Sequence, residues 1–340
     1  MARILGIEST CDETAAAVVV DGYDVRSSIV ATQVEIHAKY RGVVPEIASR
    51  AHIENILPVL REAVEKAGMI LPDIDAVAVT HRPGLIGSLL IGLTAAKTLA
   101  WALGKPLIGV DHVHAHLYSV MLEKPDFPWK PAVGLVISGG HTALYRVDDF
   151  DSVQLLGCTI DDAVGEAYDK VSAILGLGYP GGPVIDVLAA EGDPNAIQFP
   201  RTMLGRESLD FSFSGLKTAV LYHVRGFQGR ERPAGSVSDQ ERKDVAASFQ
   251  AACVDILTKK LQRALKATRA KAIIVGGGVS ANRGLREALA KLPVEVHFPA
   301  LNYCTDNAAM SAGLADLAYR QGRFSTLDLD AITSSQFAVT

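Results

Sequence analysis

The sequence predicts an α/β protein of two lobes, each built around a mixed sheet whose opening strands are antiparallel. Two observations predict this class. A strand, a short Ser/Thr turn and a second strand occur twice, at residues 4–20 and again at 133–147. After each copy, helical and strand patterns alternate along the chain. With 340 residues, the chain is long enough to fill two hydrophobic cores.

The first half opens with three strands, expected at 3–8, 15–21 and 25–32. The elements expected after them are a helix at 45–67, a strand at 75–80, a helix at 85–103 and a strand at 107–110. Three prolines, Pro125, Pro128 and Pro131, then mark a linker, because proline interrupts regular structure. We therefore expect a first lobe at 1–110, completed by the C-terminal helix.

The second half repeats this order. Its expected elements are strands at 132–138, 142–147 and 153–158, helices at 161–176 and after the turn at 178–183, a long helix at 238–268, a strand at 271–276, a helix at 281–291, a strand at 294–298 and a helix at 305–321. Residues 192–237 fit no repeated element and are interpreted as an insertion. We expect a second lobe at 111–325 and a tail at 326–340, with ligands in the cleft between the lobes.

The composition is that of a soluble enzyme, with 49% hydrophobic and 21% charged residues. No apolar run reaches the roughly 18–20 residues of a membrane helix, so we expect a cytoplasmic protein without membrane contact. Its four cysteines form no CxxC pair, which argues against a disulfide framework or a zinc ribbon. The net charge of −5 gives no global attraction to nucleic acid.

One basic cluster lies on the helix expected at 238–268. Its members are Lys259, Lys260, Arg263, Lys266 and Arg269. Because mixed charge is common on exposed helices, we interpret the cluster as a solvated face.

The segment after the strand at 107–110 carries a candidate metal site. His112 and His116 are four residues apart on an expected helix, so their imidazoles share one face while His114 points elsewhere. Asp306, at the start of the last helix, could add a carboxylate from the other lobe. Two histidines and one carboxylate suit Fe(II), with Zn(II) as the alternative. An isolated HxxxH pair can also be a polar helix face, and the position of a zincin's glutamate is occupied by Val113.

Two further groups of residues carry chemistry. Asp12 and Glu13 follow the first Ser/Thr turn, where a carboxylate can orient a nucleophile or accept its proton, although both could be exposed turn acids. The Ser/Thr turns themselves offer hydroxyls and N–H groups to an anion. Asp169 is the expected ribose partner, because a carboxylate accepts two hydroxyl hydrogen bonds. Gly181 and Gly182 would let the backbone approach a purine.

Taken together, these motifs resemble one family. They are GIESTCDET at 6–14, GVVPEIASRAH at 42–52, PGLIGSLL at 83–90, HVHAH at 112–116, SGGHT at 138–142, DDAVGEAYDK at 161–170, GYPGGP at 178–183, DFSFSGLKT at 210–218, GGGVSANR at 276–283 and NYCTDN at 302–307. The chain resembles the TsaD-type tRNA adenosine threonylcarbamoyltransferases, formerly called the O-sialoglycoprotein endopeptidase or glycoprotease family. This family belongs to the actin-like ATPase superfamily, whose duplicated ribonuclease H-like lobes flank a cleft.

The resemblance implies an acyl transfer. A threonylcarbamoyl group would move from threonylcarbamoyl-adenylate to the exocyclic amine of the adenosine beside the anticodon, in tRNAs that read codons beginning with A. It also implies partners: the tRNA, a smaller paralogous actin-like subunit (TsaB type), an ATPase subunit (TsaE type) and an upstream threonylcarbamoyl-adenylate synthase. The alternative is an actin-like kinase or ATPase switch, which would need no histidine ligands; a silent scaffold would have lost them.

The resemblance also implies roles for residues. The metal would be held by His112, His116 and Asp306. The phosphate and acyl region of the intermediate would be lined by Ile137, Ser138, Gly139, Gly140 and His141. Its adenosine, or that of ATP, would be held by Asp169, Gly182, Asp186 and Asn282. Asp12 and Glu13 would serve the transfer step. One departure is Arg82, which stands where the family usually has glycine.

Overall fold

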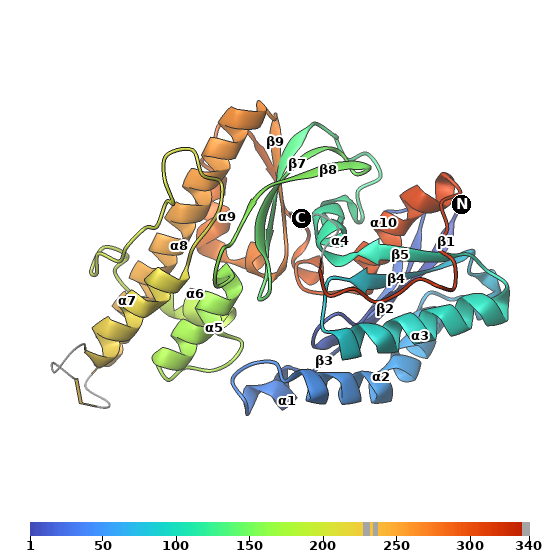
Figure 1. The fold of residues 1–340 in the computed structure, drawn as a ribbon, viewed down its shortest axis with the longest axis horizontal. Helices are drawn as coiled ribbons and strands as arrows, with labels where there is room; N and C mark the ends of the chain where they lie inside the picture. Colours follow the sequence, from blue (N-terminus) through green and yellow to red (C-terminus); the bar gives the residue numbers. More distant parts are fainter. Residues whose placement is uncertain (227–231, 234–236, 335–340) are drawn as a thin grey trace. The chain divides into compact units, whose positions relative to one another are not determined.

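The computed structural model describes residues 1–226, 232–233 and 237–334 (Figure 1). These residues form two compact units. Unit 1 consists of Met1–Trp129 and the described residues from Pro299 on, and unit 2 consists of Lys130–Phe298. Each unit has a five-stranded sheet that mixes parallel and antiparallel pairs. The predicted α/β class with two mixed sheets is confirmed.

The sheet of unit 1 has the strand order β3-β2-β1-β4-β5. Its strands are β1 (Arg3–Glu8), β2 (Glu13–Val20), β3 (Asp24–Thr32), β4 (Ala76–Arg82) and β5 (Leu107–Asp111). The helices of this unit are α1 (Val34–Ala38), α2 (Pro45–Lys66), α3 (Ile86–Leu103), α4 (His112–Tyr118) and α10 (Ala308–Arg320). Short 3-10 turns lie at Leu71–Asp73, Ser119–Met121 and Leu301–Tyr303.

The two faces of this sheet are covered by different helices. Successive residues of a strand point to opposite faces. Leu5 and Ile7 of β1 join a core with residues of α2 and α3. Gly6, between them, faces α10: a Cβ atom there would lie 2.4 Å from the Ala308 carbonyl oxygen. A glycine at this position therefore lets the start of α10 pack directly on β1, which positions the residues just before that helix.

The unit boundary differs from the lobes expected at 1–110 and 111–325. Helix α4 packs against α10, and α10 packs on β1, β2, β4 and β5, so both helices belong to unit 1. The described part of the tail expected at 326–340 also belongs there, because the Ile332 N–H donates to the His81 carbonyl. Residues 335–340 of that tail lie outside the described residues.

Helix α3 corrects one expectation from composition. Its 18 residues are long and apolar enough to cross a membrane by length and composition, with a mean hydropathy of 1.5. In unit 1, however, one side of this helix packs on β4 and α2, burying Leu89, Leu93 and Ala96. Its apolar composition is therefore partly explained by the core that it helps to form.

The sheet of unit 2 has the strand order β10-β9-β6-β7-β8. Its strands are β6 (Ala132–Ile137), β7 (Thr142–Asp149), β8 (Ser152–Cys158), β9 (Ala272–Gly276) and β10 (Glu295–His297). Its helices are α5 (Val164–Ile174), α6 (Gly181–Ala189), α7 (Ser214–Arg225), α8 (Asp239–Thr268) and α9 (Arg283–Leu289), with a 3-10 turn at Gly278–Ala281. The core of this unit joins β6 and β9 to the buried side of α8.

Two helices were not expected from the sequence. They are α1 and α7, and α7 lies inside the region interpreted as an insertion. Asp161 organises the start of α7: its carboxylate accepts from the backbone N–H groups of Phe213 and Ser214 and from two serine hydroxyls. Because this cap comes from 52 residues away, no local pattern indicates it.

Candidate functional site

Helix α4 and the segment before α10 bring three candidate metal ligands together in unit 1. Nε2 of His116 lies 3.1 Å from Oδ1 of Asp306, and Nε2 of His112 lies 3.5 Å from the same oxygen. The ligand atoms of all three residues lie within 4.8 Å of one another. Asp306 is therefore a neighbour of the histidines within one unit, whereas the sequence analysis expected it from the other lobe.

Local capping explains this placement. Asp111 caps α4 by accepting from the N–H groups of Val113 and His114, so the helix begins at His112 and turns its histidines at positions 1 and 5 to the same side. Asn307 caps α10 by accepting from the Met310 N–H. Asp306 immediately precedes this cap, which directs its chain segment toward α4.

The donor set fits a divalent transition metal. With metal–ligand bonds of about 2.1 Å, neighbouring ligand atoms in a tetrahedral or octahedral shell lie about 3.0–3.4 Å apart. The separation of 3.1 Å between His116 and Asp306 falls within this range, and that of 3.5 Å between His112 and Asp306 lies just above it. Two imidazoles and one carboxylate are the ligand set of non-haem Fe(II) sites with open positions, and they also suit Zn(II).

A buried carboxylate stands behind the histidines. Oε2 of Glu8 lies 3.2 Å from Nδ1 of His112, and the Thr80 hydroxyl donates to the same oxygen at 2.6 Å. The Thr10 N–H donates to the other oxygen of Glu8 at 2.8 Å. Glu8 is fully buried, so these partners compensate for a charge that burial alone would strongly disfavour. A carboxylate that holds Nδ1–H of a histidine leaves Nε2 free to bind a metal.

Glu8 is the residue that the sequence analysis missed. It was quoted only as part of a turn motif. The available signal is a carboxylate at the end of the otherwise apolar strand Ile4-Leu5-Gly6-Ile7, a position where burial requires a partner. The identity of that partner, 104 residues away, could not be read from the pattern.

The two histidines have opposite electrostatic environments. Burial lowers the pKa of His112, but Asp306 and Glu8 outweigh burial and raise it to about 9. Burial, followed by the charge of His112, lowers the pKa of His116. Nδ1 of His116 is buried and has no hydrogen-bond partner among the described residues. His116 is therefore suited to bind as a neutral imidazole, whereas His112 must release a proton before it can bind a metal.

The turn that carries Asp12 and Glu13 is pinned by its neighbours. The Leu85 N–H donates to the Thr10 carbonyl at 2.9 Å, and His52 Nε2 lies 3.0 Å from the Cys11 carbonyl oxygen. The hydroxyl of Ser9 is buried and donates to the Ser88 carbonyl. Together with Thr10, which contacts His112, Ser9 is thus used internally, and the expected offer of these two hydroxyls to an anion is wrong.

Glu13 lies in a strongly acidic environment. Burial, followed by the charges of Asp12 and Asp306, raises the pKa of Glu13 to about 9. The Thr32 hydroxyl donates to Oε1 of Glu13 at 3.0 Å. The structure thus brings Asp12, Glu13 and the candidate metal ligands into one electrostatic neighbourhood. At neutral pH in the metal-free protein, Glu13 is protonated and can donate a hydrogen bond.

The second Ser/Thr turn, at the end of β6 in unit 2, exposes its backbone. Two hydrogen bonds between Ser138 and His141 hold the turn, from the Ser138 N–H to the His141 carbonyl and from the His141 N–H to Oγ of Ser138. A Cβ atom at Gly139 or Gly140 would meet nothing within 4 Å. Their backbone is therefore accessible to a ligand. Ile137 is fully buried, so it can contribute to such a site only through its backbone.

The residues expected to hold adenosine lie in two groups within unit 2. Oδ1 of Asp169 accepts from the Gly181 N–H at 2.6 Å, at the start of α6, and Gly182 beside it has open space. Asp186 accepts from the side-chain amides of Gln250 and Asn282, at 2.9 and 3.1 Å.

Asn282 is more constrained than expected. Its amide nitrogen also donates to Gln250, and its oxygen caps α9 by accepting from the Leu285 N–H. This side chain is thus engaged within the protein, where it supports Asp186.

The comparisons with known proteins identify the family of the chain. A sequence model of the TsaD family, tRNA N6-adenosine threonylcarbamoyltransferase, matches residues 24–313. The chain belongs to this family. A tRNA N6-adenosine threonylcarbamoyltransferase of Moorella thermoacetica is 52% identical over 334 residues, 97% of this chain and 96% of that protein. The one of Treponema denticola is 52% identical over 315 residues, 92% of this chain and 91% of that protein.

Distant solved structures share the fold alone. HypF of T. kodakarensis matches with a TM-score of 0.62 and 16% identity, over 96% of this chain and 49% of that one. Component A of the (R)-2-hydroxyglutaryl-CoA dehydratase of Acidaminococcus fermentans matches with a TM-score of 0.54 and 14% identity, over 94% of this chain and 99% of that one. Together with the family match, they support the two-lobed actin-like fold class.

The departure of this TsaD-family chain at Arg82 has a structural explanation. Nε of Arg82 lies 3.6 Å from Oδ2 of Asp111, whose other oxygen caps α4. Arg82 is not among the described residues with a positive φ, so the position does not require glycine here. The arginine therefore adds an ion pair to the carboxylate that begins the histidine helix.

Glu8→Gln tests the carboxylate behind the site. The amide keeps the shape of the side chain but removes the negative charge that accepts the Nδ1–H hydrogen bond of His112. Metal affinity should therefore fall by about 10–100-fold. Isothermal titration with Fe(II) under anaerobic conditions, or with Zn(II), measures this directly. An unchanged dissociation constant for both ions would contradict the role of Glu8.

Proposed function

We propose that this chain transfers the threonylcarbamoyl group from threonylcarbamoyl-adenylate to the exocyclic amine of the adenosine beside the anticodon, in tRNAs that read codons beginning with A. The observation that carries the proposal is the match to the TsaD family along nearly the whole chain, combined with the His112, His116 and Asp306 cluster. An actin-like kinase or ATPase switch is not favoured, because it would not need two buried histidines beside a carboxylate.

Reconstitution tests this function. The purified chain, its partners and the adenylate are incubated with unmodified tRNA, and the nucleosides are analysed by mass spectrometry. Formation of threonylcarbamoyladenosine that depends on this chain is the expected result. A reaction that proceeds equally without it would contradict the proposal. Depletion of the protein in cells should remove the same nucleoside from tRNA.

The metal that we propose for the cluster is Fe(II), with Zn(II) as the alternative. Support comes from the ligand set and from the spacing of its donor atoms. A bound divalent ion would supply Lewis acidity toward a carbamoyl or phosphate oxygen. Within the protein, Glu8 orients His112 and the two helix caps hold the ligand segments in place.

We further propose that unit 2 binds the adenylate. The open backbone of Gly139 and Gly140, with Ser138 and His141, suits the phosphate and acyl region, because N–H groups in a turn can cradle an anion. Ile137 would take part through its backbone. For the adenosine of the adenylate or of ATP, the proposed contacts are Asp169, Gly182 and Asp186, with Asn282 supporting Asp186.

Asp12 and Glu13 are proposed to act in the transfer step. An attacking amine must lose a proton, and a nearby carboxylate can accept it. The raised pKa of Glu13 favours Asp12 as the acceptor and Glu13 as the hydrogen-bond donor in this pair.

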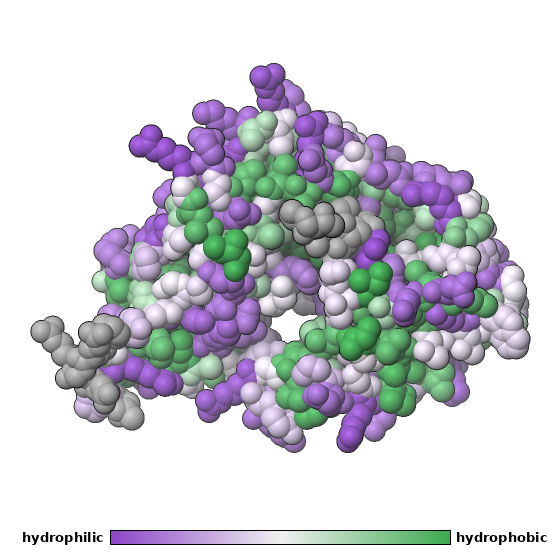
Figure 2. All heavy atoms as spheres, in the orientation of Figure 1, coloured by the Kyte–Doolittle hydropathy of each residue, from purple (hydrophilic) through white to green (hydrophobic). Residues whose placement is uncertain are grey.

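The proposed partners are the tRNA, a TsaB-type subunit, a TsaE-type ATPase and the synthase that supplies the adenylate. An apolar surface supports a protein partner on unit 1. On α2, Ile53 and Leu57 are 60% and 68% exposed, and on the adjacent α3, Ile86 and Leu90 are 49% and 43% exposed. Figure 2 shows hydrophobic residues gathered over α2 and α3. An actin-like subunit could bury this surface. A cytoplasmic location follows from these partners and remains part of the proposal.

Charge exchange on α2 tests the interface. Glu46 and Arg50 are exposed and lie on the same helical face as Ile53 and Leu57. Glu46→Lys with Arg50→Glu keeps the net charge but reverses the local pattern, so affinity for the TsaB-type subunit should fall about tenfold or more. The matched control exchanges Glu62 and Lys66, an exposed ion pair farther along α2. Titration calorimetry giving equal affinities for both double variants would place the interface elsewhere.

A further inference from the structure

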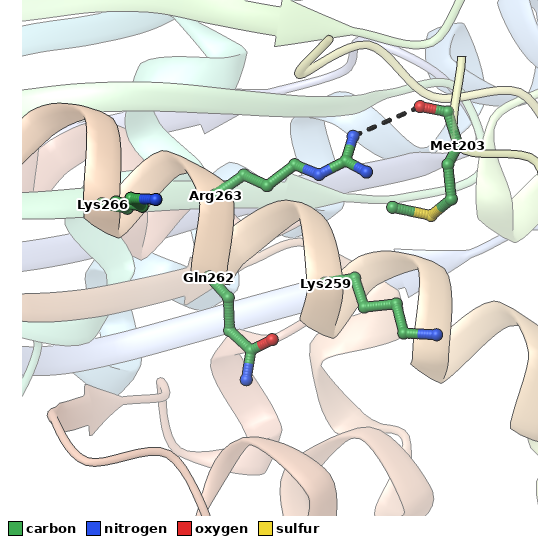
Figure 3. Close-up of a pocket in the computed structure, with 5 residues that line it drawn as sticks. All are labelled: Met203, Lys259, Gln262, Arg263 and Lys266. Carbon is green, nitrogen blue, oxygen red and sulfur yellow. Dashed lines mark hydrogen bonds between the residues drawn. The ribbon is translucent and has the colours of Figure 1, made fainter. Parts of the chain in front are cut away.

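The basic side of α8 in unit 2 forms a surface pocket of about 490 Å³. Its lining residues are Met203, Lys259, Gln262, Arg263 and Lys266 (Figure 3). In Figure 3, Arg263 extends from α8 to the loop at Met203, and Lys259 extends from the preceding turn. Three cations on neighbouring turns of one helix thus line a single concave surface.

The loop that completes the pocket is held to α8 by cations. The buried ammonium of Lys260 donates to the carbonyls of Met203 and Ser208, at 2.9 and 2.7 Å. Arg263 donates to these carbonyls and, at 2.8 Å, to that of Gly205. These carbonyls carry no net charge, so this clamp orders the loop without neutralising the cations.

A second pocket of unit 2 also carries cations. It lies at the C-terminal end of α8 and is lined by residues that include Arg146, Asp148, Arg269 and Lys271. Lys266, which lines the first pocket, and Arg269, which lines the second, are three residues apart in the sequence at the end of α8. We call the six cations the α8 basic surface: Arg146, Lys259, Arg263, Lys266, Arg269 and Lys271.

The charge balance of the α8 basic surface is positive, although the whole chain carries −5. Lys259 pairs with Asp255, which also binds Arg201, and Arg146 pairs with Asp148. The other four cations have no carboxylate partner among the described residues. The interpretation of the cluster as a solvated face is wrong for Lys260, which is buried. Around the two pockets the cations outnumber the carboxylates Asp148 and Asp255 that pair with them.

We propose that the α8 basic surface binds backbone phosphates of the tRNA substrate, an inference that rests on the proposed function. From Lys259 to Arg269 the surface extends ~15 Å along the helix. An extended row of cations matches a polyanion that carries regularly repeated charges, and each phosphate contact adds affinity by releasing counterions. Such contacts position the RNA without reading its sequence.

The test uses cations that have no structural role in the loop clamp. Lys266 and Lys271 are exposed, and one lies in each pocket. The full-length double variant Lys266→Glu with Lys271→Glu should bind unmodified tRNA at least about tenfold more weakly at low salt. The slope of log affinity against log salt should become shallower by about 1–2. The control, Lys39→Glu with Arg61→Glu, makes the same change of net charge at exposed positions of unit 1 and should bind as the unchanged protein does.

The readouts separate this inference from the proposed function. In the reconstituted transfer assay, the double variant should raise KM for tRNA and leave kcat at saturating tRNA nearly unchanged. If the unchanged protein makes no threonylcarbamoyladenosine, the proposed function is wrong. The measured affinity for tRNA still tests whether the α8 basic surface binds RNA. Equal tRNA affinity and salt slope for the double variant and the control would overturn the inference. Loss of binding to polyglutamate without loss of tRNA binding would also overturn it, in favour of an acidic protein partner.

Discussion

His116→Ala is expected to lose bound metal and transfer activity together while the fold persists. The variant removes one of the three proposed metal ligands. Nε2 of His116 lies 3.1 Å from Oδ1 of Asp306, a distance that suits two ligands of one ion. Activity should fall by more than the ~10–100-fold that loss of an outer partner of a metal ligand costs. Plasma mass spectrometry measures the metal, and the tRNA assay measures transfer. Circular dichroism and thermal unfolding check that the variant is folded.

His114→Ala is the matched control on the same helix. His114 is not part of the ligand cluster, and its backbone N–H, which Asp111 caps, survives the substitution. This variant should therefore retain both metal and activity. Equal metal content in the two alanine variants would refute the ligand assignment.

Amide substitution of the acidic turn should have the second large effect. Asp12→Asn, at the proposed proton acceptor, should lower turnover by roughly 10²–10⁴. Glu13→Gln tests the proposed hydrogen-bond donor in the same assay. Binding of the adenylate should change little, because the residues proposed to hold it lie in unit 2. Rapid-quench turnover and equilibrium binding of the adenylate measure the two quantities separately. Near-normal turnover in both single variants would make Asp12 and Glu13 ordinary turn acids.

A pH measurement on the metal-free protein checks the environment of Glu13. Its pKa is raised to about 9, so the folded protein holds a proton that the unfolded chain releases near pH 4.5. This group's contribution to stability is complete below about pH 4.5 and is lost as the pH rises toward 9. Glu13→Gln should therefore flatten the fall in unfolding free energy over this range. Denaturant unfolding at several pH values measures the unfolding free energy of the unchanged protein and of the Glu13→Gln variant. Identical pH dependence of the two would contradict the raised pKa of Glu13.

Most of the secondary structure could be predicted from the sequence, because strands and helices depend on hydrophobic patterns within short segments. Apolar runs placed the strands, and the spacing of His112 and His116 placed both imidazoles on one helical face. Helices α1 and α7 were missed: α1 is five residues long, and the start of α7 depends on a distant carboxylate. The Ser/Thr turns looked equivalent in sequence. Burial distinguished them, since Ser9 lies inside unit 1 whereas Gly139 and Gly140 are exposed.

The sequence by itself determined the family, the α/β class and the three candidate ligands, because motif identity and helical spacing are properties of short segments. Only the tertiary structure decided that Asp306 joins the histidines within unit 1, that Glu8 lies behind His112, and that the cations of α8 line one surface. These relations join residues up to about 190 positions apart. They depend on packing such as that of α10 on Gly6, and packing between distant segments leaves no periodic signal along a single chain.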